Sequence, residues 1–112
     1  MVYKYYKLVR DKIVNNINSQ KGKKATWRTM EEDEYLEELN KKLIEEAKEF
    51  IEKNDPEELA DLMEVLEAII KVRNIKLDEV RKIKEQKKEK KGAFQDRIFL
   101  ETVEEPEIEQ EK

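Results

Sequence analysis

The chain has 112 residues, of which 46% are charged and 38% hydrophobic, and it contains no cysteine and no histidine. This composition excludes a disulfide framework, a thiol nucleophile, an imidazole base and a zinc site built from Cys and His. Two glycines and two prolines are too few for a turn-rich β-sandwich, and no glycine-rich phosphate-binding loop is present. Acid–base or metal chemistry would have to use carboxylates, lysine, tyrosine or water.

The net charge of −4 conceals four blocks of opposite sign. The net charges are +7 for residues 1–30, −12 for 31–67, +6 for 68–100 and −5 for 101–112. An acidic centre with basic flanks can hold a cation and a polyanion together, although most charge runs are solvated helix faces. No signal peptide and no apolar run of membrane-spanning length is present, so we expect a cytoplasmic protein with no membrane partner.

The first 30 residues predict one short helix. Residues 7–18 place four apolar side chains at roughly helical spacing: Leu8, Val9, Ile13 and Ile17. A polar turn follows at 19–24. The segment 25–30, "ATWRTM", permits a short strand or an extended stretch.

A pair of longer helices is predicted next, over residues 31–53 and from Pro56 to about residue 73. The first has an apolar face made of Leu36, Leu39, Leu43, Ala47, Phe50 and Ile51. The second has one made of Leu59, Leu62, Met63, Leu66, Ile69 and Ile70. Asp55 suits the N-cap of the second helix and Pro56 its first turn, and a link this short makes the two helices antiparallel neighbours.

A further helix with a weak apolar pattern is predicted over residues 78–91, with Gly92 as its stop. The fold class is therefore mainly all-α. With so little apolar sequence, we expect the helical hairpin to be completed into a bundle by homo-oligomerisation. We assign residues 1–100 to one helical domain and 101–112 to an acidic, disordered tail.

Four carboxylates lie beside the apolar stripes of the two long helices. On a helical wheel, Glu46 flanks the apolar stripe of its helix, about 60° from Glu49. Glu58 falls inside the stripe of the next helix and Asp61 on its edge. Because the helices are antiparallel across a tight link, the two pairs would face each other. Mutual repulsion and burial would then be relieved by a bound Mg²⁺ or Mn²⁺.

Each acidic pair also has an explanation that involves no metal. Glu58 could reach back to Asp55 in a capping box, and glutamates such as Glu45 and Glu49 are often surface partners of lysines. One such pair alone is a weak motif. Two pairs on consecutive antiparallel helices, both at the apolar margin, favour a metal site about as strongly as they favour these alternatives.

At these residues the chain resembles a known family. The segment "EEAKE" (45–49) followed by "ELAD" (58–61) is similar to the E-E-x-x-E … E-x-x-D signature of the MazG-like all-α nucleoside triphosphate pyrophosphohydrolases. The segments "KLVRDKI" (7–13) and "KKGAFQDRIFL" (90–100) resemble the ends of a small phosphoribosyl-ATP pyrophosphohydrolase-like subfamily. Ala93 departs from that pattern, in which a second glycine is usual.

The resemblance implies a homodimer or homotetramer that binds Mg²⁺ through Glu46, Glu49, Glu58 and Asp61. It implies cleavage of a nucleotide between its α and β phosphates, giving a monophosphate and pyrophosphate, in a house-cleaning role. Glu45 is a further catalytic candidate, for positioning the attacking water. Five cations match the terminal segments and would bind the phosphates: Lys7, Arg10, Lys12, Lys91 and Arg97. In a chain with 24 Lys and Arg, any one of them is more often only solvated.

Other functions are compatible with parts of the same sequence. Phosphoribosyl-ATP is a second substrate for the same chemistry, and a non-catalytic helical interaction module would use the same apolar faces. Trp27 and the tyrosines at 3, 5 and 6 could stack a base, although such aromatics more often pack in a core or an interface. Nucleic-acid binding is disfavoured, because the acidic centre and tail would repel a phosphate backbone.

Overall fold

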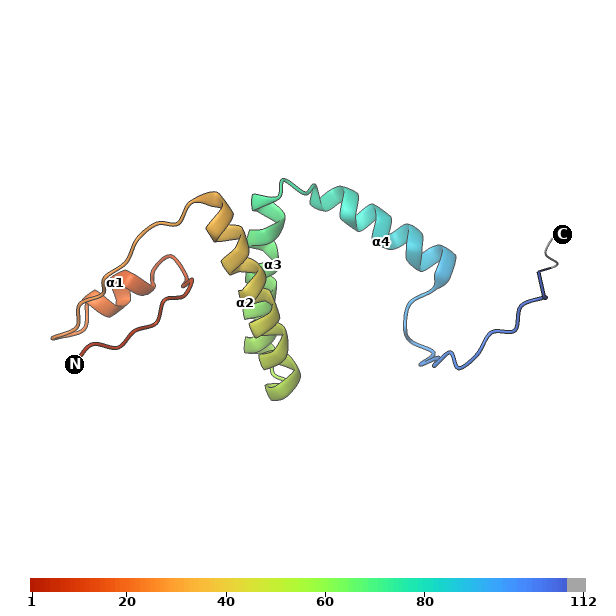
Figure 1. Ribbon diagram of the computed structural model, residues 1–112, viewed down its shortest axis with the longest axis horizontal. Helices are drawn as coiled ribbons and strands as arrows, with labels where there is room; N and C mark the ends of the chain where they lie inside the picture. The colour runs from red at the N-terminus through yellow and green to blue at the C-terminus, as the bar shows by residue number, and fades with distance from the viewer. Residues whose placement is uncertain (109–112) are drawn as a thin grey trace. The chain divides into compact units, whose positions relative to one another are not determined.

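The computed structural model describes residues 1–108, and its regular structure there consists of four α-helices without a strand (Figure 1). The helices are α1 (Ile13–Asn18), α2 (Glu32–Lys53), α3 (Pro56–Val72) and α4 (Leu77–Lys91). The all-α prediction is confirmed. Among the helices described here, none combines the length and the apolar character needed to span a bilayer.

Helices α2 and α3 lie side by side as an antiparallel hairpin (Figure 1). Asn54 ends α2 in a left-handed conformation with φ of 52°, which reverses the chain within one residue. Asp55 then caps α3, because its Oδ1 accepts a 3.0 Å hydrogen bond from the Glu58 backbone N–H. Pro56 begins α3 in the first turn, where its missing N–H costs nothing. The predicted bounds of both helices are confirmed to within a residue.

The hydrophobic core is small and lies between these two helices. Only Leu39, Val65 and Ile69 are buried apolar side chains in the described chain. Partly buried residues pack around them: Leu8, Tyr35, Leu43, Ala68 and Val72. Leu8 is the member contributed by the N-terminal segment, so that segment is held against the hairpin.

The first helix is much shorter than predicted. The prediction of a helix over residues 7–18 is wrong, because α1 has six residues and begins at Ile13. Its N-cap, Lys12, makes no side-chain capping hydrogen bond, and no acidic residue lies in its first turn, so neither capping nor the helix dipole stabilises the start of this short helix. Residues 25–30 form neither a helix nor a strand.

The chain divides into two compact units, Met1–Leu77 and Asp78–Lys112. In the second unit α4 has no buried residue, as its weak apolar pattern predicts. Gly92 ends α4 with φ of +85°, and its N–H donates to the Lys88 carbonyl at 2.7 Å, which confirms the predicted stop. The boundary expected at residue 100 stays a prediction.

Candidate metal centre

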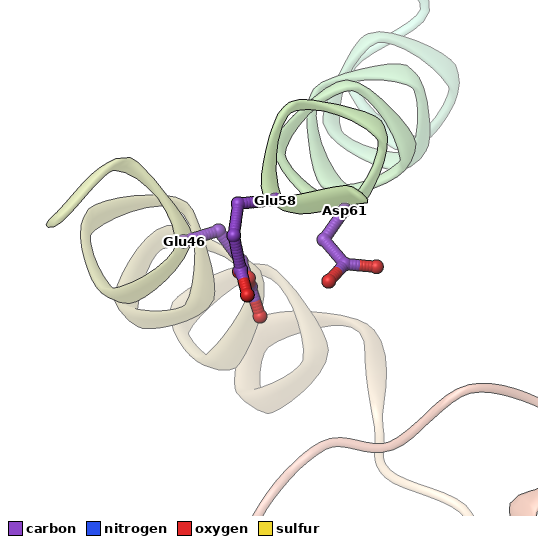
Figure 2. Close-up of side chains that lie close together, drawn as sticks. All are labelled: Glu46, Glu58 and Asp61. Atoms are coloured by element: carbon purple, nitrogen blue, oxygen red, sulfur yellow. The ribbon is translucent and has the colours of Figure 1, made fainter. Parts of the chain in front are cut away.

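Three carboxylates from the two long helices converge beside the hairpin link. One oxygen each of Glu46, Glu58 and Asp61 lies within 4.8 Å of the others. Figure 2 shows Glu46 on α2 and the other two on α3, with all three side chains directed to the same side of the helix pair. Helix geometry explains the grouping of the α3 residues, because positions three apart occupy adjacent sites on one helix face.

The two glutamates at this centre are buried without full hydrogen bonding. Glu46 is 7% exposed, and the Glu58 side chain is 12% exposed. The Oε2 atoms of both are buried and have no hydrogen-bond partner. A buried carboxylate oxygen without a partner costs folding free energy, so each of these atoms has an unused capacity to accept a ligand.

Burial and repulsion act together on Glu46. Removal from water raises the pKa of the Glu46 carboxyl, Lys42 opposes that rise, and the neighbouring carboxylates Glu49, Asp61 and Glu45 add to it. The ionised form of the Glu46 carboxyl is therefore less favourable than that of a solvent-exposed glutamate.

One cation is paired with each carboxylate. Lys42 Nζ lies 3.7 Å from Glu46 Oε1, one turn earlier on α2. Lys53 Nζ, in the last turn of α2, lies 3.3 Å from Glu58 Oε1. These two contacts involve the oxygens opposite the unpartnered ones.

Arg10 supplies the third pair, from the N-terminal segment. Its Nη2 lies 2.7 Å from Asp61 Oδ1. Leu8, two residues earlier, packs against the core, so the backbone that carries Arg10 is anchored on the hairpin.

The structure brings together three of the four predicted metal ligands. Glu49 is half-buried and is not in the cluster of Glu46, Glu58 and Asp61. Glu49 lies about 60° from Glu46 around α2, further from the apolar stripe, which accounts for its position outside the cluster. Glu45 is exposed. Glu58 pairs with Lys53 rather than reaching back across its cap.

The predicted phosphate-binding cations fall into two groups. In the first unit Arg10 is at the carboxylate centre, whereas Lys7 and Lys12 are exposed. In the second unit Lys91 and Arg97 line one hollow of about 290 Å³. Arg97 has a left-handed φ of 55°, and its N–H donates to the Phe94 carbonyl at 3.3 Å.

Two cations at the centre were not singled out from the sequence. The sequence does not distinguish Lys42, because a lysine four residues before a glutamate commonly forms an ordinary surface ion pair. Its side chain is only 19% exposed, which distinguishes it from such pairs. The signal for Lys53 was its place in the last turn of α2, next to the link that leads to Glu58.

The donor set fits a hard divalent cation. All three converging side chains offer oxygen, which Mg²⁺ and Mn²⁺ prefer, and two of them present buried oxygens that no protein group satisfies. Glu46, Glu58 and Asp61 are the residues that would hold such an ion.

Comparison of the chain with known protein families, curated proteins and solved structures found no match. Any functional conclusion therefore depends on the residues just described.

Proposed function

We propose that this protein is a metal-dependent nucleotide pyrophosphohydrolase of the MazG-like type, which cleaves a nucleoside triphosphate to a monophosphate and pyrophosphate. The observation that carries the proposal is the pair of buried, unpartnered oxygens on Glu46 and Glu58, with Asp61 beside them. Such an arrangement destabilises an empty site and suits one that binds a divalent ion.

The chain's own residues would divide the work as follows. Glu46, Glu58 and Asp61 hold the ion, with Glu49 one turn along α2 as a further ligand. The chemistry that a divalent ion supplies when bound is neutralisation of phosphate charge and a lower pKa for an attacking water. Glu45 is exposed next to Glu46 and is the candidate for orienting that water.

Cationic side chains would stabilise the pyrophosphate leaving group. Arg10 is the best placed of the predicted set, because its guanidinium already lies at the carboxylate centre and can bind phosphate in a bidentate manner. Lys91 and Arg97, which share one hollow in the second unit, stay candidates for the same role, with Lys7 and Lys12.

The apolar surface of the hairpin supports a homodimer or homotetramer. Large apolar side chains remain exposed on both helices: Ile44 at 58%, Ile51 at 77%, Met63 at 53% and Leu66 at 45%. A buried core of three side chains is small for a domain that folds alone. A second hairpin packed against these residues would complete a four-helix bundle. Light scattering on the purified chain measures the expected mass, and a monomer at micromolar concentration would contradict it.

Product identification tests the proposed activity directly. The protein is incubated with Mg²⁺ and a panel of standard and damaged nucleoside triphosphates, together with phosphoribosyl-ATP. Pyrophosphate and a nucleoside monophosphate are the expected products, and inorganic phosphate as the only product would exclude α–β cleavage. The preferred member of the panel would separate the house-cleaning role, which we place in the cytoplasm, from action on phosphoribosyl-ATP.

A helical interaction module is the second candidate, and the exposed apolar residues of the hairpin favour it as well. It predicts no pyrophosphate from any nucleotide and no effect of Mg²⁺ on the melting temperature. A stabilising effect of Mg²⁺ that disappears in a Glu46→Gln/Asp61→Asn variant would exclude it.

A further inference from the structure

Each of the three carboxylates at the centre is paired with its own cation, two from α2 and one from the N-terminal segment. Lys42 is within α2, Lys53 is in its last turn, and Arg10 lies in the N-terminal segment.

In the three pairs, three cations balance the formal charge of the three carboxylates, but two carboxylate oxygens still lack a partner. Lys42 and Lys53 contact Oε1 of their glutamates, while both Oε2 atoms stay buried without a partner. Because Glu46 is more than nine-tenths buried, its free oxygen is an independent sign that a further positive ligand belongs here. The lysines thus neutralise charge without completing the coordination of the carboxylates.

We infer that Lys42, Lys53 and Arg10 form a phosphate-binding collar that changes partners: they neutralise the carboxylates in the ion-free chain and bind the phosphate oxygens of a polyphosphate once a divalent ion has taken the carboxylates. This inference rests on the proposed function, and it adds Lys42 and Lys53 to the residues that recognise the substrate.

The physical basis is competition for the charge of the same carboxylates. A divalent ion carries twice the charge of an ammonium group and approaches carboxylate oxygens more closely, so its binding neutralises the carboxylates and weakens their attraction for Lys and Arg. The released cations remain attached to backbone beside the ion, which is where the oxygens of an ion-bound phosphate chain must lie. Lys42 contributes most to this geometry, because its side chain is only 19% exposed and has little freedom to move away.

The collar predicts that removal of a lysine changes the affinities for Mn²⁺ and for pyrophosphate in opposite directions. Lys42→Met and Lys53→Met remove a competitor for the carboxylates and a donor for phosphate, while they keep an unbranched side chain of similar length. Mn²⁺ affinity should rise roughly two- to fivefold, the value of a partly exposed ion pair. Inorganic pyrophosphate affinity, with Mn²⁺ in excess, should fall about tenfold, the value of a charge-assisted hydrogen bond.

Electron paramagnetic resonance of free Mn²⁺ measures the first affinity and titration calorimetry with pyrophosphate measures the second, both on the full chain. Lys48→Met is the matched control, because Lys48 is an exposed lysine of the same helix that forms no ion pair with Glu46, Glu58 or Asp61 in the described structure. It should change each affinity by less than about twofold. Arg10→Met should behave as the two lysine variants do.

Three results would overturn the collar. If the lysine variants bind both ligands as the wild type does, the two residues are only solvated; if they bind both more weakly, they are structural. In either case nucleotide cleavage to pyrophosphate by the wild type would leave the proposed function standing. If Mn²⁺ binding is absent, or persists undiminished in Glu46→Gln/Asp61→Asn, the proposed function falls together with the collar.

Discussion

Helix α3 carries two acidic pairs with the same spacing and different surroundings. Glu58 and Asp61 face Glu46 across the hairpin and are paired with cations from two other segments. Glu64 and Glu67, six residues further along α3, are exposed and line an open hollow of about 500 Å³. The same spacing therefore accompanies two different environments, and of these two pairs only the one at positions 58 and 61 meets a facing carboxylate at the edge of the buried surface.

The largest effect expected from this comparison is on catalysis. Asp61→Asn should lower kcat/KM for nucleotide cleavage by about a hundredfold or more, since loss of a supporting group around a metal already costs about 10- to 100-fold. Glu67→Gln removes the same charge from the same helix and should leave the rate within about twofold. Steady-state assays of released pyrophosphate compare the two variants, and equal losses would erase the distinction between the pairs.

Stability in the presence of Mg²⁺ should also separate the pairs. At a free Mg²⁺ concentration about 100 times the dissociation constant, ligand linkage adds about 2.7 kcal/mol to the free energy of unfolding. Glu58→Gln should lose most of this stabilisation, because the carboxylate that it removes belongs to the cluster, whereas Glu64→Gln should retain it. Urea unfolding with and without Mg²⁺ measures both, and an identical response of the two variants would argue against a localised site.

A smaller effect should arise from the cap that begins α3. Asp55→Ala removes the acceptor of the Glu58 N–H and should lower the free energy of unfolding by about 1 kcal/mol. Asp55→Asn keeps an acceptor oxygen and should restore most of that loss. Chemical denaturation gives the values, and a cap variant as stable as the wild type would show that tertiary contacts alone hold the start of the helix.

The smallest effect expected is the pH dependence that Glu46 imparts without metal. Burial raises the pKa of its carboxyl in the folded state, so the folded chain binds this proton more tightly than the unfolded chain does. The group's contribution to stability is therefore most favourable at or below the ordinary glutamate pKa. It is lost as the pH rises through the raised value.

Glu46→Gln lacks this titration. In the presence of a chelator, its stability relative to the wild type should increase between about pH 4 and pH 7. Glu64→Gln should show no such trend, because Glu64 is exposed. A stability difference between Glu46→Gln and the wild type that does not change with pH would contradict the role assigned to burial.

The sequence was sufficient for the hairpin and for most of the candidate site. Strong apolar periodicity, Asp55 and Pro56 placed α2 and α3 to within a residue, because these signals are local. Local spacing is not sufficient at the N-terminus, where the apolar residues from Leu8 onward predict a single helix over residues 7–18. Leu8 instead packs on the hairpin core, a tertiary contact that no local pattern reveals.

Among the site residues, the positions of Glu46 and Glu58 on the helical wheel correctly predicted that both lie at the edge of the buried apolar surface. Glu49 has the family spacing but lies outside the cluster of Glu46, Glu58 and Asp61, and its role as a ligand stays a prediction. Lys42 and Lys53 could not be chosen from the sequence, because the chain holds 24 Lys and Arg and their relation to the carboxylates depends on how the helices pack.

The length of the link between α2 and α3 determines how α3 is rotated relative to α2. The link consists of Asn54 and Asp55 alone, so a change in its number of residues would change that rotation. One inserted residue would turn the start of α3 by about 100° unless the cap reformed, and Glu58 would then point away from Glu46. Natural variation in this protein is therefore expected to tolerate changes of side chain near the link more readily than changes of its length.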